Sequence, residues 1–285
     1  MNLNKIVVLM CMVLLGACAS EKDYLITIKT EYGDMHAILY DKTPQHKDNF
    51  IKLAKEGFYD SLLFHRVIKD FMIQTGDPDS KNAQSGRPLG SGGPGYQIPA
   101  EFDKSLFHEK GALSAARTDN PEKKSSGSQF YIVQGKKWSK AELTTDMNKL
   151  GQAAQQLMNR GDQDSVKQIL LSIYKTQGPE AYGEKLMEIK DYIAKVMQVD
   201  ISKKVASERL EAYTTIGGSP HLDDEYTVFG RVIHGLEVID KIATQPTDRR
   251  DRPKEDIRMQ VEVEEMPKSK ITKLYGYEFP KDDKQ

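Results

Sequence analysis

The chain has 285 residues, a formal net charge of −1 and 29% charged residues. This balance gives no electrostatic bias toward nucleic acid or an anionic surface, so no nucleic-acid partner is expected. Apolar residues make up 38% of the sequence, an ordinary composition for one or two domains with hydrophobic cores.

The N-terminal segment differs from this average. Residues 6–15 form an unbroken apolar run, and Leu15-Gly16-Ala17-Cys18 follows it. The run is too short to span a bilayer and is typical of the apolar part of a secretory signal. The small residues before Cys18 resemble the lipobox of bacterial lipoproteins, which implies cleavage before Cys18 and acylation of its thiol. A plain secretory signal is the alternative.

Cysteine use agrees with export. Both cysteines, Cys11 and Cys18, lie in this segment, so the rest of the chain has no thiol that could form a stray disulfide. We expect residues 1–18 to be a lipoprotein signal peptide with its lipobox and residues 19–23 to be a tether. Ala19 follows the cysteine, which by the rule for enteric bacteria favours a lipid anchor in the outer membrane. The expected location is therefore the cell envelope, facing the periplasm.

The first structured region is expected to be a hairpin followed by a helix. Residues 24–30 and 35–40 are rich in β-branched and aliphatic side chains and flank a turn at Tyr32-Gly33-Asp34. Thr43-Pro44 predicts a helix start, with Thr43 as the cap and Pro44 at the first helical position. Gly57 is expected to end that helix.

The remaining pattern up to residue 135 and beyond residue 217 consists of short strands. They are expected at 62–67, 70–75, 112–116, 129–134, 227–233 and 257–264, with a short helix at 235–243. Many short strands with glycine-rich turns and two helices predict a mainly β fold closed into a barrel.

Residues 136–216 have a different texture. Ser139 and Glu142 have capping-box spacing, and three apolar stripes at helical spacing follow. An inserted helical subdomain is predicted, because a structureless loop of this length inside a compact domain is improbable. The charged segment 266–285 is expected to be a loosely held C-terminal tail.

Several catalytic patterns can be set aside. The glycines of GSGGPG at 90–95 have dinucleotide-loop spacing, but no strand-to-helix context surrounds them. Ser128 lacks the glycine that a nucleophile elbow requires two positions later. The six histidines have no zinc-like spacing and are expected to be structural or exposed. No cofactor or metal is therefore expected.

The stretch FHRVIKDFMIQTGD at 64–77 places Arg66 among apolar residues, and burying an unpaired guanidinium is costly. This stretch resembles the cyclophilin motif FHRxIxxFMxQxGD. Three more segments resemble that family and follow in its order: LGSGGPGYQIPAEF, SSGSQFYIV and PHLDDEYTVFGRV. Without the insertion, residues 24–135 and 217–265 total 161 residues, about one cyclophilin domain.

The resemblance implies a closed eight-stranded antiparallel barrel with two packing helices, and prolyl cis–trans isomerase activity. It implies that Arg66 is the catalytic residue and that Ala116 and Arg117 bind the substrate backbone. It further implies that the substrate pocket is formed by Phe71, Met72, Gln74, Gln129, Tyr131, Leu222 and Tyr226.

The chemistry suits this set, because twisting an X–Pro amide breaks no bond and needs no nucleophile or cofactor. A guanidinium can donate to the prolyl nitrogen, and Gln74 is expected to accept from Arg66 and fix its plane. The expected substrates are proline-containing unfolded or partly folded polypeptides during export. Two alternatives remain: an envelope chaperone or binding module that uses the barrel and insertion without significant catalysis, and a structural envelope lipoprotein.

Overall fold

The computed structural model describes residues 21–161 and 164–280, so the predicted signal segment and the proposed lipidation site Cys18 lie outside the described residues. The elements in chain order are β1 (Lys22–Thr30), β2 (Gly33–Leu39), α1 (Pro44–Lys55), β3 (Arg66–Ile68), β4 (Met72–Thr75), the 3-10 turn η1 (Pro78–Ser80), β5 (Gln97–Ile98), β6 (Ala112–Ala115), β7 (Ser125–Ser126), β8 (Phe130–Val133), α2 (Lys140–Thr144), α3 (Met147–Asn159), α4 (Asp164–Glu188), α5 (Lys190–Met197), α6 (Ser207–Thr215), the 3-10 turn η2 (Pro220–Leu222), β9 (Val228–His234), α7 (Leu236–Ala243), β10 (Gln260–Pro267) and α8 (Lys268–Tyr275).

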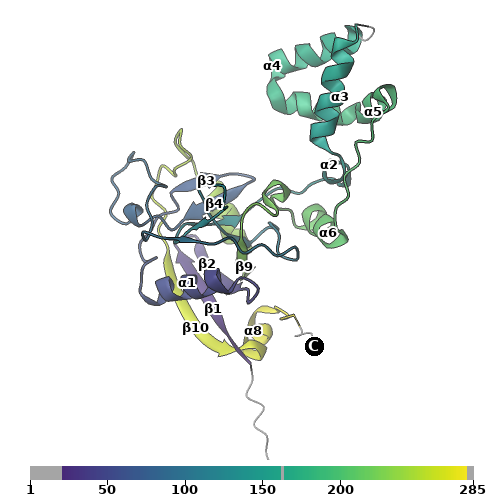
Figure 1. Cartoon of the computed structure of the whole chain (residues 1–285). Coiled ribbons are helices and arrows are strands. Elements are labelled where there is room, and N and C mark those ends of the chain that lie inside the picture. The colour runs from purple at the N-terminus through teal and green to yellow at the C-terminus, as the bar shows by residue number, and fades with distance from the viewer. Residues whose placement is uncertain (1–20, 162–163, 281–285) are drawn as a thin grey trace, which may run out of the picture.

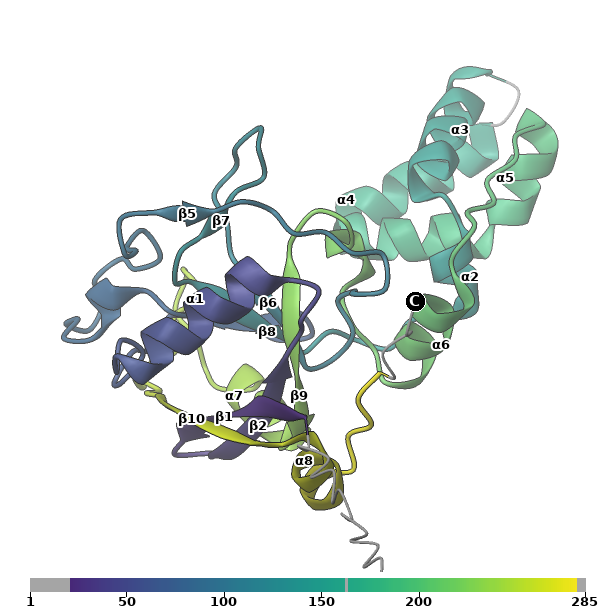
Figure 2. The ribbon, with the colours of Figure 1, turned by 60° about the horizontal axis from the view of Figure 1, so that its bottom comes forward.

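Eight strands form one antiparallel sheet in the order β10-β1-β2-β9-β6-β8-β4-β3, and β5 pairs with β7 in a separate small sheet (Figures 1 and 2). The predicted hairpin over 24–40 is confirmed as β1 and β2. The other predicted strands are also present, with ends that differ by a few residues.

The prediction of a closed barrel is not confirmed, because the two edge strands β10 and β3 do not pair with each other. The chain segments that precede these strands do meet. The Ser61 N–H donates to the Met259 carbonyl at 2.9 Å, and the Phe64 N–H donates to the Ile257 carbonyl at 2.9 Å. The sheet thus curls until its two edges come into contact. However, β3 has only three residues, and its strand pairing is with β4 and not with β10.

Two helices cover the core, as predicted. α1 packs against β9 and β10, while α7 packs against β2, β3 and β4. Their apolar faces join the inward side chains of the sheet in one cluster that includes Phe50, Ile239, Ile73, Leu113 and Ile132. This burial is the main stabilising contribution to the sheet domain.

The start of α1 differs in one respect from its prediction. Pro44 occupies the first helical turn as expected, but Thr43 makes no side-chain cap. The Glu101 carboxylate accepts instead from the backbone N–H groups of Gln45 at 3.1 Å and His46 at 3.0 Å. A residue distant in sequence therefore satisfies the free N–H groups that every helix start exposes.

Helices α2–α6 occupy the segment between β8 and η2, and Figures 1 and 2 show α3, α4 and α5 projecting away from the sheet. These three helices share a core of their own that includes Leu150, Leu157, Leu170, Leu186 and Ile193. The capping box of Ser139 and Glu142 is confirmed at the start of α2. α2 and α6 pack together between the projecting helices and the sheet.

Residues 268–280, the described part of the C-terminal segment beyond β10, pack more closely on the sheet domain than the sequence suggested. They begin with α8, which packs against β1 and β10. Ile271 is fully buried, and Tyr275, Tyr277 and Phe279 pack on the same cluster. The apolar face of this segment was not recognised from the sequence, because only a few apolar residues among many charged ones contribute to it. Within the described ranges, no helix has both the length and the apolar character needed to cross a membrane.

Candidate active site

One row of side chains crosses four strands of the sheet. Arg66 on β3 lies opposite Gln74 on β4, Gln74 lies opposite Tyr131 on β8, and Tyr131 lies opposite Ser114 on β6. Residues that oppose one another in a ladder project to the same face. Strand register therefore brings Arg66, Gln74 and Tyr131 together from segments about 60 residues apart in the sequence.

The period of two along each strand separates this face from the core. Ile73 and Ile132 point into the main core. Their neighbours Met72, Tyr131 and Val133 belong to a second apolar cluster on the opposite face. The apolar run that surrounds Arg66 in the sequence thus supplies both a core and the floor of a site.

A cavity of about 310 Å³ opens on this second face. Nine of the ten site residues implied by the sequence resemblance line it: Arg66, Phe71, Met72, Gln74, Ala116, Arg117, Tyr131, Leu222 and Tyr226. The tenth, Gln129, lines an adjoining groove that also contains Gln74, Ala116 and Arg117. The structure therefore brings the whole predicted set to one region of the surface.

Gln129 connects the site to the glycine-rich loop. Its side-chain nitrogen donates to the carbonyls of Gly90 at 3.0 Å and Gly92 at 2.7 Å. Its side-chain oxygen accepts from Gln74 Nε2 at 3.1 Å. A side chain at Gly92 would collide with the Asp77 carboxylate, 2.1 Å from the position of a Cβ. These contacts fix the loop as one wall of the groove, and the short strand β5, not a helix, follows it.

Arg66 is more accessible than its sequence context suggested, since its side chain is 44% exposed. Its Nε lies 3.5 Å from Asp251 Oδ2, and the Asp251 side chain is 43% exposed. The predicted hydrogen bond from Arg66 to Gln74 is not found among the described residues, where the Gln74 amide nitrogen donates to Gln129 Oε1 at 3.1 Å. Within residues 21–161 and 164–280, the terminal nitrogens of Arg66 donate to no protein acceptor, so they are available to a ligand.

Arg117 lines the cavity, but its guanidinium is paired with acidic partners. Its guanidinium lies 3.4 Å from Glu225 Oε2 and 3.7 Å from Asp119 Oδ1. It also stacks 4.6 Å above the centroid of the Tyr226 ring. The charge added by this residue is therefore largely compensated, and its main effect on the cavity is to hold the Tyr226 ring in place.

The cavity also includes residues that the sequence analysis did not assign. They are His65, Arg87, Pro88, Leu89, Gly90, Asp248, Arg250 and Arg252. His65 could have been found, because it directly precedes Arg66 at the start of the recognised motif. Residues 248–252 lie in a loop without periodicity, and nothing in the sequence indicated that this loop closes over β3.

His65 is buried, and neither of its ring nitrogens has a hydrogen-bond partner among the described residues. Burial lowers the pKa of His65 to about 4, against smaller opposing effects from the Asp77 carboxylate and the backbone at Leu63. The ring is therefore neutral near pH 7 and contributes no charge beside Arg66. Burial also raises the pKa of Tyr131, which keeps its hydroxyl protonated.

A family model described as cyclophilin type peptidyl-prolyl cis-trans isomerase/CLD matches residues 25–152 and 157–263. The chain belongs to the cyclophilin family. A Staphylococcus aureus protein assigned as a peptidyl-prolyl cis–trans isomerase is 31% identical to this cyclophilin over 245 residues, which cover 84% of this chain and 91% of that protein. A Streptococcus pyogenes protein assigned as a bifunctional phosphatase/peptidyl-prolyl cis–trans isomerase is 33% identical over 240 residues, or 81% of this chain, but this chain spans only 37% of its length.

Among solved structures, a Cryptosporidium parvum cyclophilin type peptidyl-prolyl cis–trans isomerase is 19% identical to this cyclophilin, with a TM-score of 0.49, and covers 86% of this chain and 98% of its own. Family membership gives this cyclophilin its reaction, the cis–trans isomerisation of the peptide bond before proline. Proline-containing peptides are accordingly its substrate class. Without a catalyst this exchange takes about 10–100 s at 25 °C, so it limits the folding of many chains.

Proposed function

We propose that this cyclophilin lowers the barrier to X–Pro rotation by donating hydrogen bonds from Arg66 to the twisted amide, and that it acts on exported polypeptides. Amide resonance opposes rotation with a barrier of roughly 18–20 kcal/mol. At the perpendicular geometry the prolyl nitrogen regains a lone pair, which a donor can stabilise. Such a contact exists only in the transition state, so it accelerates the reaction instead of merely tightening binding.

The observation that carries the mechanism is an uncommitted guanidinium beside an apolar floor. The Arg66 terminal nitrogens have no acceptor within the described chain, and the Asp251 contact involves Nε at 3.5 Å. The floor beneath the cavity contains Met72, Tyr131 and Leu222, which are 2%, 5% and 9% exposed. A proline ring seated on this floor would exclude water from the donor, and electrostatic stabilisation strengthens in a dry site.

A second donor lies on the other side of the floor. The Ala116 N–H donates to the Gln129 carbonyl at 2.9 Å, and the Ala116 carbonyl accepts from the Ser126 N–H at 2.7 Å. The N–H of Arg117, one residue further along, has no acceptor among the residues described. It can bind the carbonyl of the substrate residue before proline and hold that half of the amide while the other half rotates.

The test of activity uses the soluble chain without residues 1–18 and a short X–Pro peptide. We expect acceleration of the cis–trans exchange in proportion to the concentration of the chain. If no protein concentration accelerates the exchange, the chain has the cyclophilin fold but no isomerase activity, and the proposal is contradicted.

The export role rests on the N-terminal segment. An apolar run of ten residues precedes Cys18, and no further cysteine follows it. We propose that acylation of Cys18 anchors the chain in the outer membrane facing the periplasm, where newly translocated polypeptides fold. Expressed in its bacterial host, the full chain should fractionate with membranes and incorporate labelled fatty acid, whereas Cys18→Ser should do neither. Equal labelling of both proteins would contradict the anchor.

The second candidate function is that of a binding module whose helical insertion holds unfolded protein. The observation that favours it is the exposure of apolar side chains on α4, where Ile169, Leu171 and Tyr174 are 49%, 39% and 55% exposed. A chain that binds unfolded protein but leaves peptide exchange unaccelerated would support this candidate over the enzyme.

A further inference from the structure

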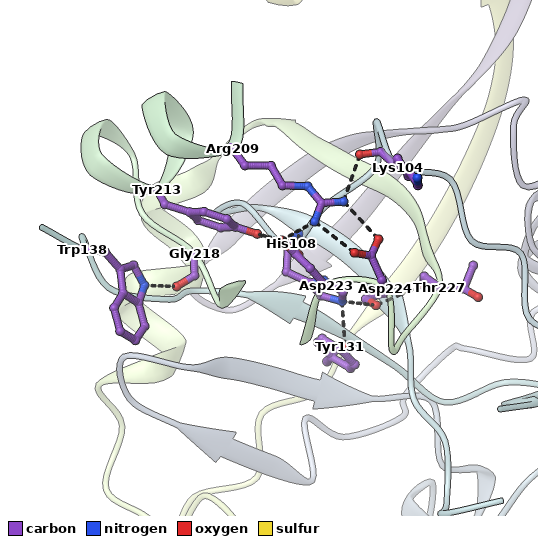
Figure 3. A network of polar contacts seen from close by, with 11 residues as sticks. Lys104, His108, Tyr131, Trp138, Arg209, Tyr213, Gly218, Asp223, Asp224 and Thr227 are labelled. Atoms are coloured by element: carbon purple, nitrogen blue, oxygen red, sulfur yellow. Dashed lines mark hydrogen bonds and ion pairs between the residues drawn. The ribbon is translucent and has the colours of Figure 1, made fainter. Parts of the chain in front are cut away.

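Helix α6 of the insertion reaches the sheet domain through two polar side chains. The Tyr213 hydroxyl lies 2.8 Å from Asp223 Oδ1 and 2.7 Å from Asp223 Oδ2 (Figure 3). Arg209 Nη1 lies 3.2 Å from Asp223 Oδ2, and the same guanidinium pairs with Asp224 and donates to the Lys104 carbonyl at 3.0 Å. Because the Asp223 side chain is only 8% exposed, its charge depends on these donors from the insertion.

Asp223 in turn fixes His108, whose side chain has no exposed surface. Asp223 Oδ1 lies 3.0 Å from His108 Nδ1 and accepts from the His108 backbone N–H at 2.9 Å. A carboxylate can only accept, so Nδ1 carries the proton. Burial lowers the pKa of His108 despite the opposing effect of Asp223, so the ring is neutral near pH 7 and Nε2 is an acceptor.

The acceptor at Nε2 faces two hydroxyls. Ser114 Oγ lies 3.0 Å and the Tyr131 hydroxyl 3.1 Å from it. The Ser114 hydroxyl donates to the Thr227 carbonyl at 3.0 Å. With that proton donated to Thr227, the Tyr131 hydroxyl is the donor left for His108, and it also has Ser114 as a hydrogen-bond partner. Tyr131 is the aromatic residue in the floor of the substrate cavity.

The contacts form one directed chain: Tyr131 donates to His108, His108 donates to Asp223, and Asp223 accepts from Tyr213 and Arg209. We propose that Tyr213 and Arg209 are positioning residues of the isomerase, which set the place of the Tyr131 ring in the cavity from the helical insertion. This inference rests on the proposed function, because it assigns the insertion a part in the same reaction. The insertion is then a structural component of the site as well as a surface beside it.

The chain contains a matched control for this idea. Trp138, at the start of the insertion, donates from Nε1 to the Gly218 carbonyl at 2.9 Å. This bond also joins the insertion to the sheet domain, as Figure 3 shows, and neither of its ends bonds to the side chain of Asp223, His108 or Tyr131. The Trp138 backbone N–H donates to the Tyr213 carbonyl at 3.0 Å, a bond that a phenylalanine at position 138 keeps. Trp138→Phe therefore removes a comparable bond while sparing the directed chain.

The experiment is a double-mutant cycle between the two ends of the chain. Tyr213→Phe and Tyr131→Phe each remove one hydroxyl and keep the ring. In the soluble chain we expect Tyr213→Phe to lower kcat/KM for a short X–Pro peptide by about 3- to 10-fold, the range of coupling found within hydrogen-bond networks. In the Tyr131→Phe background the same change should alter kcat/KM by less than about 1.5-fold, and Trp138→Phe should stay within about twofold of the starting protein.

Equal fold-losses from Tyr213→Phe in both backgrounds would overturn the inference, and so would a loss no larger than that of Trp138→Phe. A nuclear magnetic resonance measurement separates this failure from failure of the proposed function. The His108 Nδ1–H resonance should shift in Tyr213→Phe and stay in place in Trp138→Phe, whether or not the chain accelerates peptide exchange. An unchanged His108 resonance in Tyr213→Phe would also contradict the directed chain.

Discussion

Replacing Arg66 by Ala is expected to lower kcat/KM for an X–Pro peptide by about 100-fold or more, the size of effect seen when one preorganised donor to a transition state is removed. The fold should be little affected, because the side chain is 44% exposed and its contact with Asp251 is a surface ion pair. Kinetics should therefore change while the free energy of unfolding changes by less than about 0.5 kcal/mol.

Two matched variants test whether catalysis depends on the planar hydrogen-bond donors of Arg66, on its charge alone or on its pairing with Asp251. Arg66→Lys keeps the charge but loses the planar fork of donors, so we expect it to recover only part of the lost rate. Asp251→Asn removes the acidic neighbour and leaves the donors intact, and its rate should stay within about threefold of the starting protein, as expected for loss of an exposed pair. Full activity in Arg66→Ala would contradict the mechanism even if the family fold stands.

Gly135→Ala is expected to cost about 3 kcal/mol of unfolding free energy, from left-handed strain and overpacking together. Gly135 lies two residues after the end of β8 and has a φ of +62°. A Cβ there would lie 2.3 Å from the Gly218 Cα and 2.4 Å from the Gly218 carbonyl carbon. Both contacts are with backbone where the insertion leaves and rejoins the sheet domain, so no flexible side chain can move to relieve them.

Gly151→Ala is the control for this change. Gly151 lies within α3, and a Cβ there would meet no atom within 4 Å. Alanine favours a helix interior over glycine by about 1 kcal/mol, so this variant should be slightly more stable than the starting protein. Denaturant unfolding of the two variants measures the difference. Equal stability of Gly135→Ala and the starting protein would show that the backbones at Gly135 and Gly218 can move apart at little cost in free energy.

The sequence predicted the site better than it predicted the site's surroundings. Arg66, Met72, Gln74 and Tyr131 were implied by the resemblance of their motifs to the cyclophilin family, and the strand register of the structure brings them together. Asp251 and the other residues of the loop at 248–252 reach the cavity only through the tertiary fold. No local pattern could place them, and for the same reason the partner of Gln74 was predicted wrongly.

The fold shows the same division between local and distant effects. The hairpin, α1, α7 and the capping box of α2 follow from period and capping residues close in sequence. The cap supplied to α1 by Glu101 and the packing of Ile271 of α8 against Leu25 and Ile38 depend on segments far apart in the chain. The network from Tyr213 to Tyr131 is another such effect, because it joins the insertion to a strand 82 positions earlier.

Exchange spectroscopy of an X–Pro peptide by nuclear magnetic resonance tests the central claim most directly. Uncatalysed exchange takes about 10–100 s, so cross-peaks between cis and trans forms at mixing times near 1 s report catalysis alone. We expect these cross-peaks with the starting protein and their loss with Arg66→Ala, while the peptide still shifts the resonances of the cavity residues. Cross-peaks of equal intensity with both proteins would show that the amide rotates without the guanidinium.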